Sequence, residues 1–351
     1  MSRCLQVCLP MRHVGIAVLV LCTVAACGGS SSPTSPSAAG GSSATAPASG
    51  LQGQTIDVLT GAPAGNLSVV VGSYRPVTTD ANGMFSLDSA RPGTFPAALS
   101  GPGIVPRDTT ISPSADPMRV SVIPASFDMT AFDEMFRAEN ARLQRWTVRP
   151  SLVIIASTMA LGSLSAETFV ASSEQMSADE VNQLVAHLTE GLSLLTGGAF
   201  TSFASVDVER PNAGEKVTPM RSGRITVGRY TGVVTAANTI GYGRWQAAGD
   251  GTVVGGGLFL DRDFDRNDAR RRLLRIHELG HALGYQHVKA RPSIMNASIG
   301  PEPTDFDRAG ARIAFQRVPG NRAPDADPAG VARLSSVSES GGRWSDPSVC
   351  R

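Results

Sequence analysis

The most informative segment of the sequence is HELGHALGYQH, at residues 277–287. Residues four apart on a helix are about one turn apart, so His277 and His281 project from the same face. Two imidazoles placed in this way can both reach a zinc ion at about 2.0–2.1 Å. Glu278 lies beside that face, so its carboxylate can hold a reacting water without ligating the metal. The spacing predicts a helix with two metal ligands and one candidate general base.

The third histidine of the stretch requires the chain to reverse. On a continuous helix His287 would lie about 15 Å beyond His277, out of reach of the same ion. Gly284 can end the helix there, because glycine readily takes the left-handed conformation. We therefore predict that His277, His281 and His287 bind one zinc ion. Three protein ligands leave a fourth position open, which is typical of a catalytic zinc.

This segment resembles the zinc signature of the metzincin metallopeptidases. SIMN at residues 293–296 is similar to the Met-turn of that family, in which a methionine, here Met295, lies beneath the zinc. The short gap between His287 and Met295 most resembles the matrixin branch.

The resemblance implies that residues 125–322 form an α+β catalytic domain with a twisted mixed sheet and a long active-site helix. An edge strand of such a domain binds substrate antiparallel, and residues 255–260 are the candidate for it. The resemblance further implies a zinc endopeptidase that acts on proteins or peptides. Glu278 would serve as general base and then as general acid.

Three departures from the family pattern stand out. Animal matrixins hold a second zinc with further histidines, but only His187 is spare in this domain. Their latency device is a propeptide cysteine, yet no cysteine lies between Cys27 and Cys350. Astacin- and serralysin-like members have a tyrosine two residues after the methionine, where this chain has Ala297. We expect one zinc, no latency by that route, and Cys350 inert in a loose tail.

The N-terminus has the composition of an export signal. Arg3 and Arg12 precede an apolar run over residues 14–24, and VAAC at residues 24–27 resembles the bacterial lipobox. The resemblance implies that Cys27 carries a lipid, so that the exported protein is held on a membrane of the cell envelope. An ordinary cleaved signal is the alternative.

The predicted boundaries follow from this signal. Residues 1–26 are the lipoprotein signal peptide, although translation starting at Met11 rather than Met1 stays open. Residues 27–50 are rich in Gly, Ser, Pro and Ala, so we expect a flexible tether.

Residues 51–124 have the short apolar runs of a small β-sandwich. Asn82-Gly83 between two such runs predicts a hairpin, because both residues tolerate positive φ. TTDANGMF at residues 78–85 resembles the carboxypeptidase regulatory-like family, which implies an Ig-like sandwich. Beyond the catalytic domain, residues 323–351 are rich in Pro, Ser, Gly and Asp, and we expect a disordered tail.

DRDFDRND at residues 261–268 resembles the start of a calcium loop. An EF-hand needs glycine at the sixth place and glutamate at the twelfth, where this chain has Arg266 and Arg272. Calcium binding stays open, but we favour a solvated loop in which Asp268 caps the next helix.

Charge and composition narrow the function classes. The 351 residues carry 31 Lys plus Arg against 30 Asp plus Glu, which argues against a nucleic-acid binder. Nothing indicates the oligomeric state. The alternative to an endopeptidase is a lipid-anchored binding or adhesion protein, in which the zinc domain is structural and the β-sandwich binds the partner.

Overall fold

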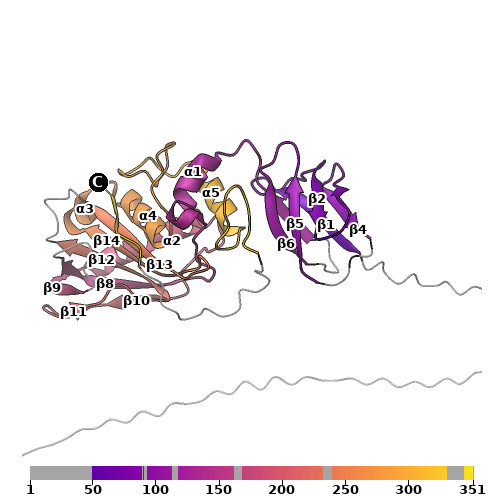
Figure 1. Ribbon diagram of the computed structural model, residues 1–351. Coiled ribbons are helices and arrows are strands. Elements are labelled where there is room, and N and C mark those ends of the chain that lie inside the picture. Colours follow the sequence, from indigo (N-terminus) through magenta and orange to yellow (C-terminus); the bar gives the residue numbers. More distant parts are fainter. Residues whose placement is uncertain are drawn as a thin grey trace, which may run out of the picture. The chain divides into compact units, whose positions relative to one another are not determined.

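The computed structural model describes residues 50–88, 90, 93–112, 118–161, 168–231, 239–329 and 344–350. The chain divides into two units, Met1–Thr45 and Ala46–Arg351, and every described residue belongs to the second. This unit is α+β with mixed sheets and few helices, which confirms the predicted class at that level (Figure 1). The predicted signal peptide and Cys27 lie outside the described residues. No helix within the described ranges is long and apolar enough to cross a membrane.

Two small sheets form from the region predicted as a β-sandwich. One has the order β4-β1-β7 and the other β3-β2-β5-β6. Alternate residues of both sheets share one buried core, which includes Leu51, Phe85, Val69 and Leu99. Their bounds are β1 (Leu51–Asp57), β2 (Ser68–Val71), β3 (Val77–Thr78), β4 (Met84–Leu87), β5 (Phe95–Ser100), β6 (Arg107–Ile111) and β7 (Met118–Val122).

The predicted Asn82-Gly83 hairpin is wrong, although the turn itself is present. Gly83 has a φ of +72°, and its N–H donates to the Asp80 carbonyl at 3.0 Å. The strands on either side pair elsewhere, β3 with β2 and β4 with β1. The turn therefore carries the chain from one sheet to the other, because each strand finds its partner at longer range.

The larger part of the fold is built on one mixed sheet with the order β11-β9-β8-β12-β14-β13-β15, where β10 also pairs with β8. β8, β10, β12 and β14 run parallel, whereas β9 and β13 run antiparallel to their neighbours. The bounds are β8 (Ser151–Ala160), β9 (Phe169–Gln175), β10 (Val206–Glu209), β11 (Lys216–Val217), β12 (Arg224–Thr231), β13 (Gly241–Ala247), β14 (Val253–Asp261) and β15 (Ser348–Cys350).

Helices cover one face of this sheet (Figure 1). The described α-helices are α1 (Met129–Phe136), α2 (Ala178–Leu195), α3 (Arg262–Asn267), α4 (Arg271–Ala282) and α5 (Asp305–Phe315). α2 begins with a complete capping box, in which Ser177 accepts from the Glu180 N–H and Glu180 accepts from the Ser177 N–H. Its buried stripe and that of α4 share a core with β8, β12 and β14.

Glycines let α4 approach the sheet closely. A Cβ on Gly243 would lie 2.9 Å from the carbonyl oxygen of Glu278, and one on Gly256 would lie 2.7 Å from that of Ala282. Real Cβ atoms do not come this close, so only glycine fits at these two positions. The part of α4 that carries His277, Glu278 and His281 is thereby held directly against β13 and β14.

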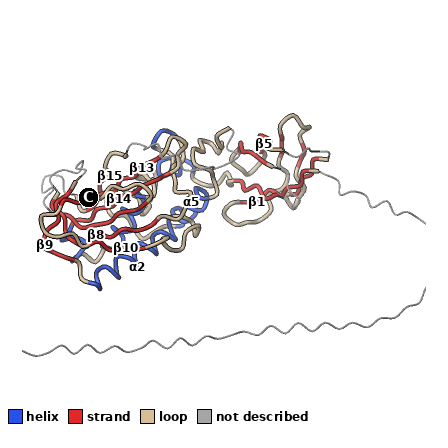
Figure 2. Tube along the Cα trace, turned by 90° about the horizontal axis from the view of Figure 1, so that it is seen from below, coloured by secondary structure: helices blue, strands red, loops and turns tan. Residues whose placement is uncertain are grey.

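The predicted edge strand is wrong. Residues 255–260 belong to β14, which lies inside the sheet between β12 and β13. The strand that covers β14 is β13, because the two pair antiparallel from Gly241 to Ala247. Figure 2 shows β13, β14 and β15 side by side.

The expectation of a disordered tail over residues 323–351 is wrong for the parts that the structure describes. Asp325 is fully buried, and its carboxylate accepts from Arg317 at 2.7 Å. Ser348–Cys350 forms β15, which pairs antiparallel with β13. Polar composition alone was misleading here, because strand pairing and ion pairs need few apolar residues.

Candidate metal centre

Three histidines converge at the end of α4. The Nε2 atom of His281 lies 3.1 Å from that of His277 and 3.2 Å from that of His287. His277 and His281 are fully buried, and His287 is half-buried. The spare histidine, His187, lies on α2, where its Nδ1 is 3.1 Å from the guanidinium of Arg275. The structure thus brings together the three histidines that the sequence singled out.

The reversal that brings in His287 is centred on Gly284, which has a φ of +104°. Its N–H donates to the His281 carbonyl at 2.9 Å, and the Tyr285 N–H donates to the Gly280 carbonyl at 3.0 Å. This pair of bonds is a Schellman motif, which ends helices through a left-handed residue. Gly284 therefore acts on the site through the backbone, as predicted from its position.

Backbone carbonyls fix the orientation of two rings. The Nδ1 of His277 is 2.7 Å from the Ile294 carbonyl, and the Nδ1 of His281 is 2.7 Å from the Tyr285 carbonyl. A carbonyl only accepts, so both Nδ1 atoms carry the hydrogen, and in the neutral rings both Nε2 atoms present lone pairs. Two lone pairs 3.1 Å apart repel unless a cation lies between them. These residues therefore fit a metal ion with nitrogen ligands, such as zinc.

The protonation of the rings suits the same ligand set. Burial lowers the pKa of His277 to about 4 and that of His281 well below its ordinary value. Burial also lowers the pKa of His287. These shifts favour the neutral imidazole, which is the form that binds metals.

Glu278 is the second chemical feature of the centre. Its side chain is fully buried, and neither carboxylate oxygen has a hydrogen-bond partner among the described residues. Burial raises its pKa well above the ordinary value. A Cβ on Gly241 of β13 would lie 2.5 Å from Oε1, so the missing side chain makes room for the carboxylate. An unpaired buried carboxylate is costly, so its presence beside metal ligands indicates a functional group.

Met295 packs against α4 between the positions of His277 and His281. Its side chain is fully buried and packs against Gly280, where a Cβ would collide with the sulfur. Its carbonyl accepts from the Val288 N–H at 2.8 Å, which ties the turn to the segment just after His287. The tight turn predicted for residues 293–296 is present.

Asp307 of α5 holds this turn in place, although no sequence pattern indicated it. Asp307 is fully buried, and its Oδ2 accepts from the Ile294 N–H at 3.1 Å. The Ile294 carbonyl in turn accepts from the Nδ1 of His277. Thr304 and Asp307 also form a capping box, with aspartate in place of the usual glutamate or glutamine. That pattern was a sequence signal for the helix start, but it gave no sign of the contact with the turn.

The acidic stretch at residues 261–268 contains helix α3, so the favoured solvated loop is wrong. Asp265 is fully buried, and its two oxygens accept from Arg229 and Arg275, each with a shortest distance of 2.7 Å. The expected cap is wrong as well, because the N-cap residue of α4 is Arg270 and no described side chain caps this helix. Asp268 accepts instead from the Arg270 N–H, at 2.7 Å, just before α4. Because arginines engage the Asp265 carboxylate, we propose no calcium site here.

Cys350 is placed where the sequence did not predict it. It is fully buried, and its sulfur, one carboxylate oxygen of Glu278 and a ring nitrogen of His277 all lie within 4.8 Å of one another. The expectation that Cys350 lies in a loose tail is wrong, because it belongs to β15, which places it beside the site. The expectation that it is inert is not tested.

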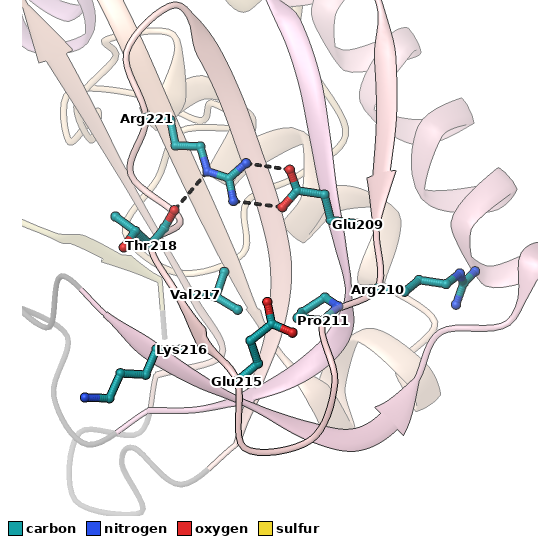
Figure 3. A pocket seen from close by; sticks show the side chains of 8 residues that line it. All are labelled: Glu209, Arg210, Pro211, Glu215, Lys216, Val217, Thr218 and Arg221. Carbon is teal, nitrogen blue, oxygen red and sulfur yellow. Dashed lines mark hydrogen bonds and ion pairs between the residues drawn. The ribbon is translucent and has the colours of Figure 1, made fainter.

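A separate surface cavity of about 460 Å³ lies beside β10 and β11 (Figure 3). Glu209 and Arg221 line it, and the Arg221 guanidinium donates two hydrogen bonds to the Glu209 carboxylate, at 2.6 and 2.8 Å. None of the predicted site residues lines this cavity, and we assign it no function.

No protein-family model matches the sequence, and a search of curated proteins finds no match either.

Proposed function

We propose that this protein is a zinc-dependent endopeptidase of the metzincin type. The observation that carries the proposal is the convergence of three histidine Nε2 atoms beside a buried, unpartnered Glu278 carboxylate. The Schellman reversal at Gly284 and the turn at Met295 add support, because they occur where the metzincin signature has its glycine and its Met-turn. The α+β fold is consistent with it.

His277, His281 and His287 would hold the metal. Zinc, when bound, supplies a Lewis acid that polarises the scissile carbonyl and lowers the pKa of water to about 7. The Ile294 and Tyr285 carbonyls fix the tautomer and orientation of His277 and His281, and hydrogen bonds of this kind strengthen metal binding.

Glu278 is the residue that would move protons. It follows a metal ligand directly on α4, and its carboxylate is withheld from every other hydrogen bond among the described residues. It would take the proton of the attacking water and deliver it to the leaving amine. Burial raises its pKa, and that shift suits a base that must next act as an acid.

The chemistry is tested by Glu278→Ala. We expect the variant to keep one zinc per chain, measured by mass spectrometry, and to lose cleavage of casein by at least about 100-fold. Glu215→Ala, which removes an exposed carboxylate, is the matched control and should cleave as the unaltered chain does. Because residues 344–350 lie beside the site, each variant is also prepared in a chain that ends at residue 343.

Two outcomes would contradict the proposal. Undiminished cleavage by Glu278→Ala would exclude this glutamate as the base. A zinc-loaded chain that cleaves no member of a broad peptide library, with or without residues 344–350, would favour the alternative of a lipid-anchored binding or adhesion protein with a structural zinc.

We further propose that the protein is exported and anchored through a lipid on Cys27. The support is the sequence of the first 50 residues, with its basic head, apolar run and VAAC motif. Mass spectrometry of the mature protein from a bacterial host tests this. An N-terminal residue other than a lipidated Cys27 would contradict it.

A further inference from the structure

We propose that the C-terminal segment, residues 344–350, is a built-in inhibitor, in which β15 covers the outer edge of β13 and Cys350 supplies a thiolate to the zinc. This inference rests on the proposed function for the metal and for the substrate. The segment lies at the C-terminal end of the chain, and the evidence for its role is the set of contacts that β15 makes.

The segment follows β13 along its length. In the antiparallel ladder Cys350 lies opposite Gly241 and Ser348 opposite Gly243, and the Ile240 N–H donates to the Cys350 carbonyl at 3.1 Å. Further along, the Ser345 N–H donates to the Trp245 carbonyl at 2.8 Å. The backbone groups on that edge of β13 are thus used by the chain itself.

This edge is the one that an extended substrate would need. Peptides commonly bind by adding a strand to an open sheet edge, where main-chain hydrogen bonds supply the affinity. β13 is the strand nearest Glu278, since Gly241 lies directly against that carboxylate. Without β15, the outer edge of β13 would be open, and a peptide paired with it would pass beside Glu278.

The side chains of β15 alternate so that Cys350 lies on the same side of the sheet as α4. Side chains of a strand alternate between its two faces. Val349 packs on the face away from α4, with the cluster that contains Tyr242 and Phe259. Cys350 belongs to the core on the α4 side, and the hydroxyl of Ser348 lies 3.5 Å from Gln286 Oε1, just before His287.

Two observations at the site point to a fourth ligand. The three histidines leave one position open in a tetrahedral zinc site. The Cys350 sulfur lies within 4.8 Å of a His277 nitrogen and of Glu278, whose two oxygens have no hydrogen-bond partner among the described residues. This group shares His277 with the three-histidine group but does not include His281 or His287, so ligation requires the sulfur to turn toward them. Thiolate is a strong zinc ligand, with a bond of about 2.3 Å.

Ligation by Cys350 would block the reaction in a simple way. The S–H bond breaks as the sulfur–zinc bond forms, and the proton is released to solvent. The thiolate then holds the position that water needs. Removal of residues 344–350 would free both this position and the edge of β13.

The thiolate is tested on the full chain with Co²⁺ in place of zinc, because a cobalt–thiolate bond gives a charge-transfer absorption. We expect this band in the unaltered chain and its loss in Cys350→Ser, with Co²⁺ still bound. Asp346→Ala changes an exposed residue of the same segment and should keep the band. Identical spectra for the unaltered chain and Cys350→Ser would overturn the inference.

Inhibition is tested with zinc-loaded chains. We expect at least about tenfold faster peptide cleavage by Cys350→Ser and by a chain that ends at residue 343, and no change for Asp346→Ala. Equal rates for the unaltered chain and both variants would overturn the inhibitory part while leaving the peptidase intact. A cobalt–thiolate band in a protein that cleaves nothing in any form would instead overturn the proposed function and keep Cys350 as a ligand.

Discussion

Asp307 orients His277, one of the three proposed metal ligands, without contacting it. Its Oδ2 accepts from the Ile294 N–H, and the Ile294 carbonyl accepts from the Nδ1 of His277. The same carboxylate accepts from Ser293 and Thr304, so all of its contacts serve the turn and the start of α5. Outer partners of this kind set ring orientation and ligand basicity.

We expect Asp307→Ala to weaken zinc binding about 10- to 100-fold, because His277 loses its fixed acceptor. Zinc affinity measured by competition with a chelator gives the result. Asp305→Ala removes an exposed carboxylate from the same helix turn and should leave the affinity unchanged. Asp307→Asn keeps the size of the side chain, so a folded variant is available if alanine destabilises the chain. Unchanged affinity in both Asp307 variants would contradict the positioning role.

At the scale of elements, β13 and β14 determine how close α4 can lie to the sheet. Gly241, Gly243 and Gly256 face the helix at positions where any Cβ would collide with it. The approach brings Glu278 against β13, so the distance from the Glu278 carboxylate to this strand depends on the absence of side chains. Interiors are close-packed, so an added methyl group there cannot be absorbed without shifts.

We expect Gly243→Ala to destabilise the protein by about 1–3 kcal/mol, the usual cost of overpacking, and to lower the melting temperature. A Cβ there would lie 2.9 Å from the Glu278 carbonyl. Gly249→Ala is the control, since a Cβ at that position would meet nothing within 4 Å. Equal melting temperatures for the two variants would show that α4 moves away from β13 at little cost.

At the scale of the whole molecule, buried ion pairs join segments far apart in the sequence. Asp325 accepts from Arg317 at 2.7 Å and from Arg107 of β6 at 3.1 Å, and all three side chains are buried. Arg317 also donates to the Ser121 hydroxyl of β7 at 2.8 Å. The small sheets are thus connected by charged hydrogen bonds to the segment that follows α5.

Removing the Asp325 carboxylate should therefore strongly lower the stability of the protein. We expect Asp325→Ala to cost about 3–5 kcal/mol at pH 7, because the buried Arg317 loses the carboxylate that pairs with it, while Arg107 keeps only Asp327. Asp263→Ala, at an exposed pair, should cost less than about 1 kcal/mol. A cost for Asp325→Ala as small as that of the control would contradict the proposed connection.

The difference in stability between the unaltered chain and Asp325→Ala should also depend on pH. Burial alone would raise the pKa of Asp325, but the charges of Arg317 and Arg107 outweigh burial and hold it below the ordinary 3.8. A lowered folded-state pKa means that the stabilisation is fully present above pH 3.8 and is lost as pH falls through the folded value. Melting temperatures of the unaltered chain and of Asp325→Ala should therefore converge below pH 3.8.

The features that depend on local geometry could be predicted from the sequence alone. Residues 277–287 predicted the helix, the reversal at Gly284 and the convergence of three histidines, because helical periodicity and a left-handed glycine act over one or two turns. The capping box at Ser177 was readable for the same reason. Zinc binding, peptide hydrolysis and lipid anchoring at Cys27 stay predictions.

Which distant residues join the site could not be predicted locally, because it depends on how the strands and helices pack. Nothing near Cys350, Asp307 or Gly241 in the sequence indicates that each lies at the metal centre, because strand pairing and helix packing bring them there. The edge of the sheet was misassigned for the same reason, since the order of β14, β13 and β15 depends on long-range pairing. Such pairing depends on the whole core rather than on any local pattern, and it brought the least expected residue, Cys350, close to His277 and Glu278.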